Sequence, residues 1–429
     1  MTALSMPGLL GTRVISFLRN RFRNFGADAA VILFARMLQN VNGFCLSIII
    51  VRKFGLAAAG SLTIATIATV VLGTLCTFGL PYIFAREKAE SRTRNTVGLM
   101  AWFGAMVVSV PAGLALGLVT GQDFTEAIVI FLLALAGPFF AQTNVANALL
   151  VLENRTSLII FAPLGNLAGL VLGYLFAGNL LGFALILTLG RLVGTLAIFL
   201  LLPLGRVGIR ALMSWVRSGL RFLTADVINL GADQASVMIA SYLMSRSELG
   251  IFGLCRQMLT LSDTPGWSRL VAWYPQVFAD PRGTIPKFTR QMLALGIFCG
   301  LSVAVLCVPL GYWIYHLPAF AYLAPLLLCS VPFRYLVGIY DMSLRAIGAV
   351  RATNEITLLR CVLVVALYTV GILLADIYGA IAATIVLAMI SAWITRIILR
   401  RNLPPEAADA KTVSEPAGIG AAPALEASR

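Results

Sequence analysis

Charged and amide side chains recur at helical spacing inside stretches of this chain that are otherwise apolar. Asp226, Asn229 and Asp233 stand at positions i, i+3 and i+7, and Arg334 and Asp341 lie seven residues apart. This spacing puts the members of each set on one face of a helix. Two shorter sets follow the same rule, namely Arg256 with Thr260 and Asp263, and Arg36 with Asn40. Polar faces on four helices predict an interior that these helices share.

The residue types favour the binding of an anion in that interior. Six arginines (Arg36, Arg191, Arg256, Arg269, Arg334 and Arg360) stand in the apolar stretches against four aspartates, which leaves an excess of positive charge. A guanidinium group stays charged, and its planar fork donates to phosphate in a bidentate geometry. We expect ligand contacts from Arg36, Asn40, Arg256, Arg269 and Arg334, with Asp226, Asp233, Asp263 and Asp341 as their counter-charges.

The alternative is that these charges form buried ion pairs that only fix how the helices pack. A charged residue at the centre of a membrane-spanning helix costs about 3 kcal/mol, so ten facing lipid would cost on the order of 30 kcal/mol. Either reading therefore turns most of them away from lipid. Arg360 stands near the start of its stretch, and we expect it to extend to the membrane interface instead.

The composition shows what kind of protein carries these residues. Of 429 residues, 59% are hydrophobic and only 12% are charged, whereas soluble domains carry about 25% charged residues. Runs without acidic or basic residues at 54–85, 95–122, 127–152, 156–190 and 291–333 each exceed the roughly 20 residues that cross a bilayer. The sequence predicts an all-α polytopic membrane protein, and excludes an outer-membrane barrel, whose strands alternate over about 10 residues.

About 12 transmembrane helices can be placed on the chain. The expected spans are 27–51, 57–83, 96–120, 124–152, 157–178, 180–204, 219–243, 248–278, 287–312, 318–344, 353–375 and 377–398. They form two six-helix lobes in tandem, which is a common plan of transporters. We expect a cytoplasmic amphipathic segment at 1–26, an N-lobe at 27–204, a cytoplasmic linker at 205–218, a C-lobe at 219–398 and a disordered cytoplasmic tail at 399–429.

The basic residues in the loops give the orientation. Lys and Arg collect at both termini and in alternate loops, while the opposite side has only Arg52, Lys53 and Arg246. Because the cytoplasmic side retains basic residues, both termini are expected in the cytoplasm. The net charge of +14 thus reports topology, and we expect no nucleic-acid partner.

Several kinds of site lack their residues in this sequence. The seven cysteines show no paired short spacing, and His316 is the one histidine, so neither a zinc site nor a histidine-based triad is predicted. No glycine-rich stretch ends in Gly-Lys-Ser/Thr, which excludes a phosphate-binding loop of that type. We expect no metal and no cofactor. The glycines at 165, 169, 173, 190 and 194 are interpreted as helix-packing positions.

Short motifs make the chain resemble a known family. They are Arg52-Lys53-Phe54-Gly55, Ala59-Gly60, Phe78-Gly79-Leu80 and Arg86-Glu87 in the first half, and Asp233, Gly250-Ile251-Phe252 and Pro275-Gln276 in the second. On these motifs the chain resembles the polysaccharide flippases, a branch of the multidrug/oligosaccharidyl-lipid/polysaccharide (MOP) exporter superfamily. The likeness covers most of residues 27–398.

The resemblance implies a function. It implies a V-shaped, MATE-like pair of lobes that moves an undecaprenyl-diphosphate-linked oligosaccharide across the bacterial inner membrane by alternating access, for cell-surface polysaccharide (exopolysaccharide) synthesis. Membrane lipids and a polysaccharide polymerase are the further partners it implies, and it implies no enzymatic activity. Arg36, Arg256, Arg269 and Arg334 would correspond to the cavity cations of the family. Gln234 departs from the family, in which a basic residue frequently follows the aspartate.

Two other functions stay open. A membrane-embedded glycan polymerase or ligase would act on the same lipid-linked sugars, but it needs a long external loop, and the loops on the expected external side are short. A cation-coupled drug exporter of the same superfamily would have the same fold and an acidic, aromatic-lined cavity. Asp226 and Asp233 are consistent with an exporter, whereas the excess of arginine is not.

Overall fold

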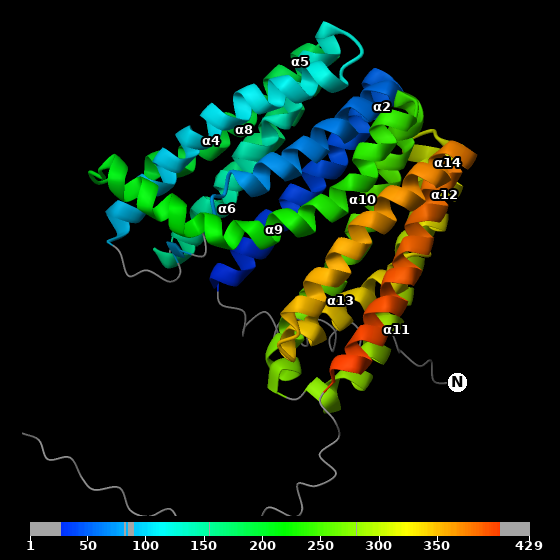
Figure 1. The fold of residues 1–429 in the computed structure, drawn as a ribbon. Coiled ribbons are helices and arrows are strands. Elements are labelled where there is room, and N and C mark those ends of the chain that lie inside the picture. Colours follow the sequence, from blue (N-terminus) through cyan, green and yellow to red (C-terminus); the bar gives the residue numbers. More distant parts are fainter. Residues whose placement is uncertain (1–26, 81–82, 85–89, 154, 280, 404–429) are drawn as a thin grey trace, which may run out of the picture.

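A computed structural model describes residues 27–80, 83–84, 90–153, 155–279 and 281–403. Within these residues every regular element is a helix. The helices form two groups that lie close together at the end where α2 reverses direction and spread apart towards the other end (Figure 1). The expected all-α fold with two lobes is confirmed.

The first group, which we call the N-lobe, contains the helices up to residue 201. They are α2 (Ala27–Leu75), α4 (Ser91–Thr120), α5 (Phe124–Ala134), α6 (Ala136–Leu152), the short 3-10 helix η1 (Thr156–Ile160), α7 (Phe161–Phe176) and α8 (Leu180–Leu201). The second group, the C-lobe, contains α9 (Ile209–Leu243), α10 (Arg246–Ala279), α11 (Pro281–Pro309), η2 (Leu310–Ile314), α12 (Pro318–Leu328), α13 (Val331–Ala346) and α14 (Val350–Asn402).

Two of these helices each contain two of the expected spans. Helix α2 has 49 residues and α14 has 53, which at 1.5 Å per residue is more than twice the roughly 30 Å of a bilayer core. The backbone of α2 leaves the helical region at Gly55 (φ 86°), and that of α14 does so at Ala375 and Asp376. These breaks fall where the sequence predicts loops, so the two helices supply four spans.

Other spans are interrupted without reversing. The fourth span is divided into α5 and α6 around Leu135, shortly before Pro138, and the tenth into α12 and α13 before Pro332. Proline removes a backbone donor, and it is tolerated best in the first turn of a helix. The 12 expected spans are therefore all found among the described helices: α2 and α14 supply two spans each, α5 with α6 and α12 with α13 supply one each, and each of the other α-helices supplies one.

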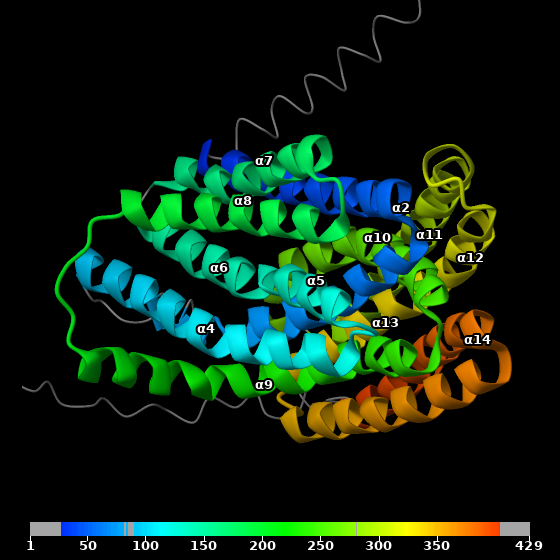
Figure 2. The same ribbon diagram turned by 90° about the horizontal axis from the view of Figure 1, so that it is seen from above.

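Helix α9 begins ten residues before the expected span at 219, so part of the expected linker 205–218 is helical. Leu212 and Trp215 pack against a buried N-lobe cluster that includes Leu80 and Phe84, and the rings of Phe84 and Trp215 lie 5.5 Å apart. This apolar contact explains why a segment rich in arginine continues as helix. Farther on α9 packs against α14, so one helix follows both lobes along one side of the molecule (Figure 2).

The expected glycine packing lies between α7 and α8. A Cβ atom on Gly165 would lie 2.5 Å from the carbonyl oxygen of Gly190, and one on Gly190 would lie 2.7 Å from Cα of Gly169. Only glycine permits such an approach of two backbones. These residues therefore hold the N-lobe together.

Candidate functional site

The candidate binding residues lie on four helices. Arg36 and Asn40 are on α2, Asp226 and Asp233 on α9, Arg256, Asp263 and Arg269 on α10, and Arg334 and Asp341 on α13. The side chains of Asp226 and Asp233 lie outside the described part of the chain, as do those of Asn229 and Gln276. The others can be placed one by one.

Arg334 and Asp263 form an ion pair that joins α13 to α10. Nη2 and Nε of Arg334 lie 2.6 Å and 2.9 Å from the same carboxylate oxygen, Oδ2. The arginine side chain is 40% exposed and that of the aspartate is 10% exposed. The second carboxylate oxygen, Oδ1, is buried and accepts no hydrogen bond from the described residues. The guanidinium group is therefore accessible although it is paired.

The neighbouring Tyr335 is bonded to the backbone on either side of Asp263. Its hydroxyl group donates to the carbonyl oxygen of Ser262 at 2.5 Å and accepts the backbone N–H of Gly266 at 3.0 Å. Between these residues Pro265 has no N–H to donate to the preceding turn. The segment Asp263-Thr264-Pro265-Gly266 suggests a bend, yet α10 continues through these residues. Tyr335 is bonded to the backbone on either side of Pro265.

The other two arginines of α10 lie in different surroundings. Nη1 of Arg256 donates to Oγ of Ser236 on α9 at 3.2 Å. Arg269 is exposed and lies over the ring of Trp273, one turn later, with 4.9 Å between its Cζ and the ring centroid. Trp273 itself stacks on Phe288 at 4.1 Å. Arg256 thus connects two helices of the C-lobe, while Arg269 contacts its own helix.

Asp341 pairs with Arg360 in a bidentate geometry. The Nη1–Oδ2 and Nη2–Oδ1 distances are 2.7 Å and 3.0 Å, and Nη2 also donates to Oγ1 of Thr395 at 2.7 Å. Both side chains are at least three-quarters buried. The expectation that Arg360 extends to the membrane interface is wrong, because the aspartate and the threonine meet its guanidinium group inside the C-lobe. The pair therefore joins α13 to the parts of α14 before and after the break at Asp376.

Arg36 and Asn40 are exposed on α2, one turn apart. Neither side chain makes a hydrogen bond or an ion pair with the described residues. Arg191 on α8 bonds to Asn166 on α7, with Nε 2.8 Å from Oδ1. The structure therefore brings together Arg334 with Asp263, and Arg360 with Asp341, as two separate pairs, and the exposed Arg36 side chain has no partner among the described residues.

A second polar cluster, which contains none of the expected ligand-binding residues, joins the two lobes. Nε of Arg246 at the start of α10 lies 3.0 Å from Oε1 of Glu126 on α5, and the side chains are 12% and 14% exposed. Ser61 on α2 donates to the same oxygen at 2.6 Å, and the backbone N–H of Gln122 donates to Oε2 at 2.6 Å. Nη2 of Arg246 also donates to the carbonyl oxygen of Thr120.

Close backbone contacts accompany this cluster. A Cβ atom on Gly60 would lie 2.2 Å from the carbonyl oxygen of Arg246, and one on Gly250 would lie 2.5 Å from that of Leu56. A Cβ on Gly253 would lie 2.0 Å from Oγ1 of Thr63. Helix α2 of the N-lobe and α10 of the C-lobe thus touch through glycines.

Two further bonds cross between the lobes at this end. The hydroxyl groups of Ser47 and Tyr315 lie 3.0 Å apart. Arg52 donates to Nε2 of His316, whose Nδ1–H points to the carbonyl oxygen of Tyr312 at 3.0 Å. We call the whole set of contacts the seam; its members are Ser47, Arg52, Gly60, Ser61, Thr63, Thr120 and Glu126 of the N-lobe and Arg246, Gly250, Gly253, Tyr315 and His316 of the C-lobe.

Comparison with known proteins gives a likeness in fold. No protein-family model and no curated protein matches the chain. Among solved structures, an inward-facing multidrug resistance MATE family transporter of the MOP superfamily has a TM-score of 0.64 and 15% identity, with 85% of this chain and 95% of that chain covered. The lipid II flippase MurJ in an inward closed conformation has a TM-score of 0.65 and 12% identity, with 87% of each chain covered.

An outward-facing MATE family transporter is less similar. Its TM-score is 0.53 at 15% identity, with 87% of this chain and 96% of that chain covered. The chain thus has the fold of the MOP-type transporters. Seven helical segments in the described part of the chain are long and apolar enough to cross a membrane. Together these findings define a multi-pass membrane protein.

Proposed function

We propose that this protein is a flippase that moves a polyprenyl-diphosphate-linked oligosaccharide across the bacterial inner membrane by alternating access, for polysaccharide synthesis. The observation that carries the proposal is Arg36, an exposed cation on a membrane helix with no partner in the described residues. A guanidinium group facing lipid at the helix centre costs about 3 kcal/mol. We infer that Arg36 faces water between the lobes, where it would meet the diphosphate.

Arg334 is the second proposed contact. It is 40% exposed, and its partner Asp263 is nearly buried. A diphosphate oxygen could approach the outer side of the guanidinium group while the carboxylate holds the inner side. Each charge-assisted contact contributes roughly 1.5–3 kcal/mol, so two would offset part of the dehydration of the headgroup. Asp263 then acts as the counter-charge when no substrate is bound.

The seam supports alternating access. It closes one end of the molecule, while the helices spread apart at the other end (Figure 1). The higher TM-score against the inward-facing MATE structure than against the outward-facing one agrees with a state that is open on one side. If the termini are cytoplasmic, as the basic loops predict, the seam is on the external side.

A translocation assay tests the proposal. The protein would be reconstituted into vesicles that carry a fluorescent undecaprenyl-diphosphate oligosaccharide, and the label reaching the outer leaflet would be followed by an impermeant quencher. We expect transfer with the native chain and little with Arg36→Ala at an equal amount of protein. Equal transfer by both chains, or none by the native chain, would overturn the proposal.

A drug exporter is the second candidate, since MATE multidrug transporters are among the structural neighbours. An exporter binds organic cations, which arginines in the cavity would repel. Efflux of a cationic dye from cells that express the chain separates the two functions. Protection of the cells from the dye would favour the exporter. If the protein is an exporter, the Arg36→Ala variant should protect the cells as well as the native chain does.

A further inference from the structure

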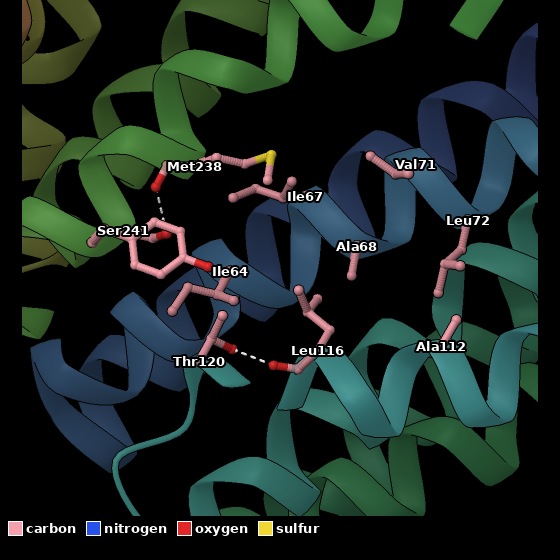
Figure 3. Close-up of a pocket in the computed structure, with 11 residues that line it drawn as sticks. Ile64, Ile67, Ala68, Val71, Leu72, Ala112, Leu116, Thr120, Met238 and Ser241 are labelled. Carbon is pink, nitrogen blue, oxygen red and sulfur yellow. Dashed lines mark hydrogen bonds between the residues drawn. The ribbon is translucent and has the colours of Figure 1, made fainter. Parts of the chain in front are cut away.

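A groove of about 220 Å³ lies between the lobes next to the seam. Its walls come from α2 and α4 of the N-lobe and from α9 of the C-lobe (Figure 3). The residues that line it are Ile64, Ile67, Ala68, Val71, Leu72, Ala112, Leu116, Thr120, Met238, Ser241 and Tyr242. Because both lobes contribute a wall, the groove exists in this form only while they are in contact.

The chemistry of the groove suits a hydrocarbon chain. None of the lining residues is charged, and only three carry a polar group in the side chain. The hydroxyl groups of Thr120 and Ser241 already donate to the carbonyl oxygens of Leu116 and Met238, at 2.8 Å and 2.7 Å. The hydroxyl group of Tyr242 is the one polar side-chain group of the lining that is not engaged in this way, and the rest of the groove is apolar, so the groove does not suit a polar headgroup.

The length of the groove is close to the thickness of one leaflet of a bilayer core. It runs from Thr120, the last residue of α4, to Ala112, eight residues earlier, which is about 12 Å along a helix. Half of a bilayer core measures about 15 Å. Met238 and Tyr242 are 45% and 64% exposed. The groove is therefore open at the surface of the protein, where a lipid could enter it.

We propose that this groove binds one acyl chain of a membrane phospholipid, and that the bound chain stabilises the closed seam. The acyl chain would lie against Ile64 and Leu116 on one side and Met238 on the other. Thr120 contacts both places, since its carbonyl oxygen accepts from Arg246 and its side chain lines the groove. Separation of α9 from α4 would remove one wall and release the lipid.

Photolabelling tests the proposal. The protein would be reconstituted into vesicles of phosphatidylethanolamine and phosphatidylglycerol that contain a phosphatidylethanolamine with a diazirine on one acyl chain, and labelled residues would be located by mass spectrometry. We expect label on Met238 or Tyr242 and on the 64–72 segment of α2. Ala112→Phe fills the groove and should reduce this label about tenfold, as a change of about 1.4 kcal/mol would. Leu118→Phe, on an exposed face of α4 outside the groove, is the control and should keep the label.

Two further arms decide the alternatives. Glu126→Gln removes the ion pair of the seam and should lower the label in the groove, because the lobes then separate. Unlabelled undecaprenyl phosphate at low mole fraction should displace no more label than the same amount of phospholipid. The proposal would be overturned by an unchanged amount of label in Ala112→Phe, by an unchanged amount in Glu126→Gln, or by selective displacement of the label by the polyprenyl lipid. None of these outcomes depends on the protein being a flippase.

Discussion

Nε of Arg246 lies 3.0 Å from Oε1 of Glu126, and this ion pair joins α10 of the C-lobe to α5 of the N-lobe. The carboxylate also accepts from Ser61 of the seam and from the backbone N–H of Gln122, four residues before it. Removal of one partner of a buried pair costs about 3–5 kcal/mol, because the other charge is left without compensation. The pair therefore favours the conformation in which the seam is closed.

Glu126→Gln should open the seam. The amide keeps the size of the side chain but loses the charge that Arg246 requires. We expect faster reaction of a cysteine placed at Thr63, which faces Gly253 across the seam, with an impermeant maleimide. Glu248→Gln is the matched control, since within the described part of the chain the Glu248 carboxylate bonds to Ser245 of its own lobe and to no residue of the N-lobe. Unchanged labelling at position 63 would show that the pair does not hold the lobes together.

Gly250→Ala should destabilise the protein through the same seam. The added methyl group would lie 2.5 Å from the carbonyl oxygen of Leu56, and overpacking of this kind costs about 1–3 kcal/mol. Thermal unfolding in detergent should show a lower Tm. Gly104→Ala in α4 meets nothing within 4 Å, and it should leave the Tm unchanged or raise it, because alanine favours a helix interior by about 1 kcal/mol. Equal Tm values for both variants would contradict the contact.

The fold could largely be predicted from the sequence because a bilayer fixes the length of the helices that cross it. Gly55 and Asp376 mark reversals that fall in the expected loops. The start of α9 was not predictable from apolar runs, because Arg210 and Arg217 are typical of a loop. Leu212 and Trp215, three residues apart, bury one side of this segment against Phe84, and such a contact depends on residues more than a hundred positions away.

The site could be predicted only in part, and the reason is physical. Helical spacing indicates which residues share a face of one helix, but it does not indicate which residue of a neighbouring helix each of them contacts. Arg334 and Asp341 share a face of α13, yet one pairs with α10 and the other with α14. Glu126 and Arg246 stand at the ends of two helices in no repeating pattern, so no spacing rule could have joined them.

Asp341→Asn should lower stability without a selective effect on substrate binding. The substitution leaves the Arg360 guanidinium group largely buried without its counter-charge, at a cost of about 3–5 kcal/mol. The double variant Asp341→Leu/Arg360→Met should regain much of the stability, because apolar residues of similar size replace a buried pair at little cost. Thermal unfolding of the single and double variants measures this difference. A double variant as unstable as Asp341→Asn would show that the pair contributes more than compensation of charge.

Arg36→Ala should have the opposite signature, with binding lost and stability retained. The Arg36 side chain is exposed and makes no bond to the described residues, so its removal leaves no buried group unsatisfied. If it meets a diphosphate, the lost contact of about 1.5–3 kcal/mol corresponds to roughly 10- to 150-fold weaker binding of a fluorescent undecaprenyl diphosphate in nanodiscs. Arg210→Ala, an exposed arginine at the start of α9, controls for net charge and should bind like the native chain. Arg334→Ala should lose binding and also some stability, since it leaves Asp263 without its partner. If Arg36→Ala binds the lipid with the affinity of the native chain, the headgroup does not bind at Arg36 of α2.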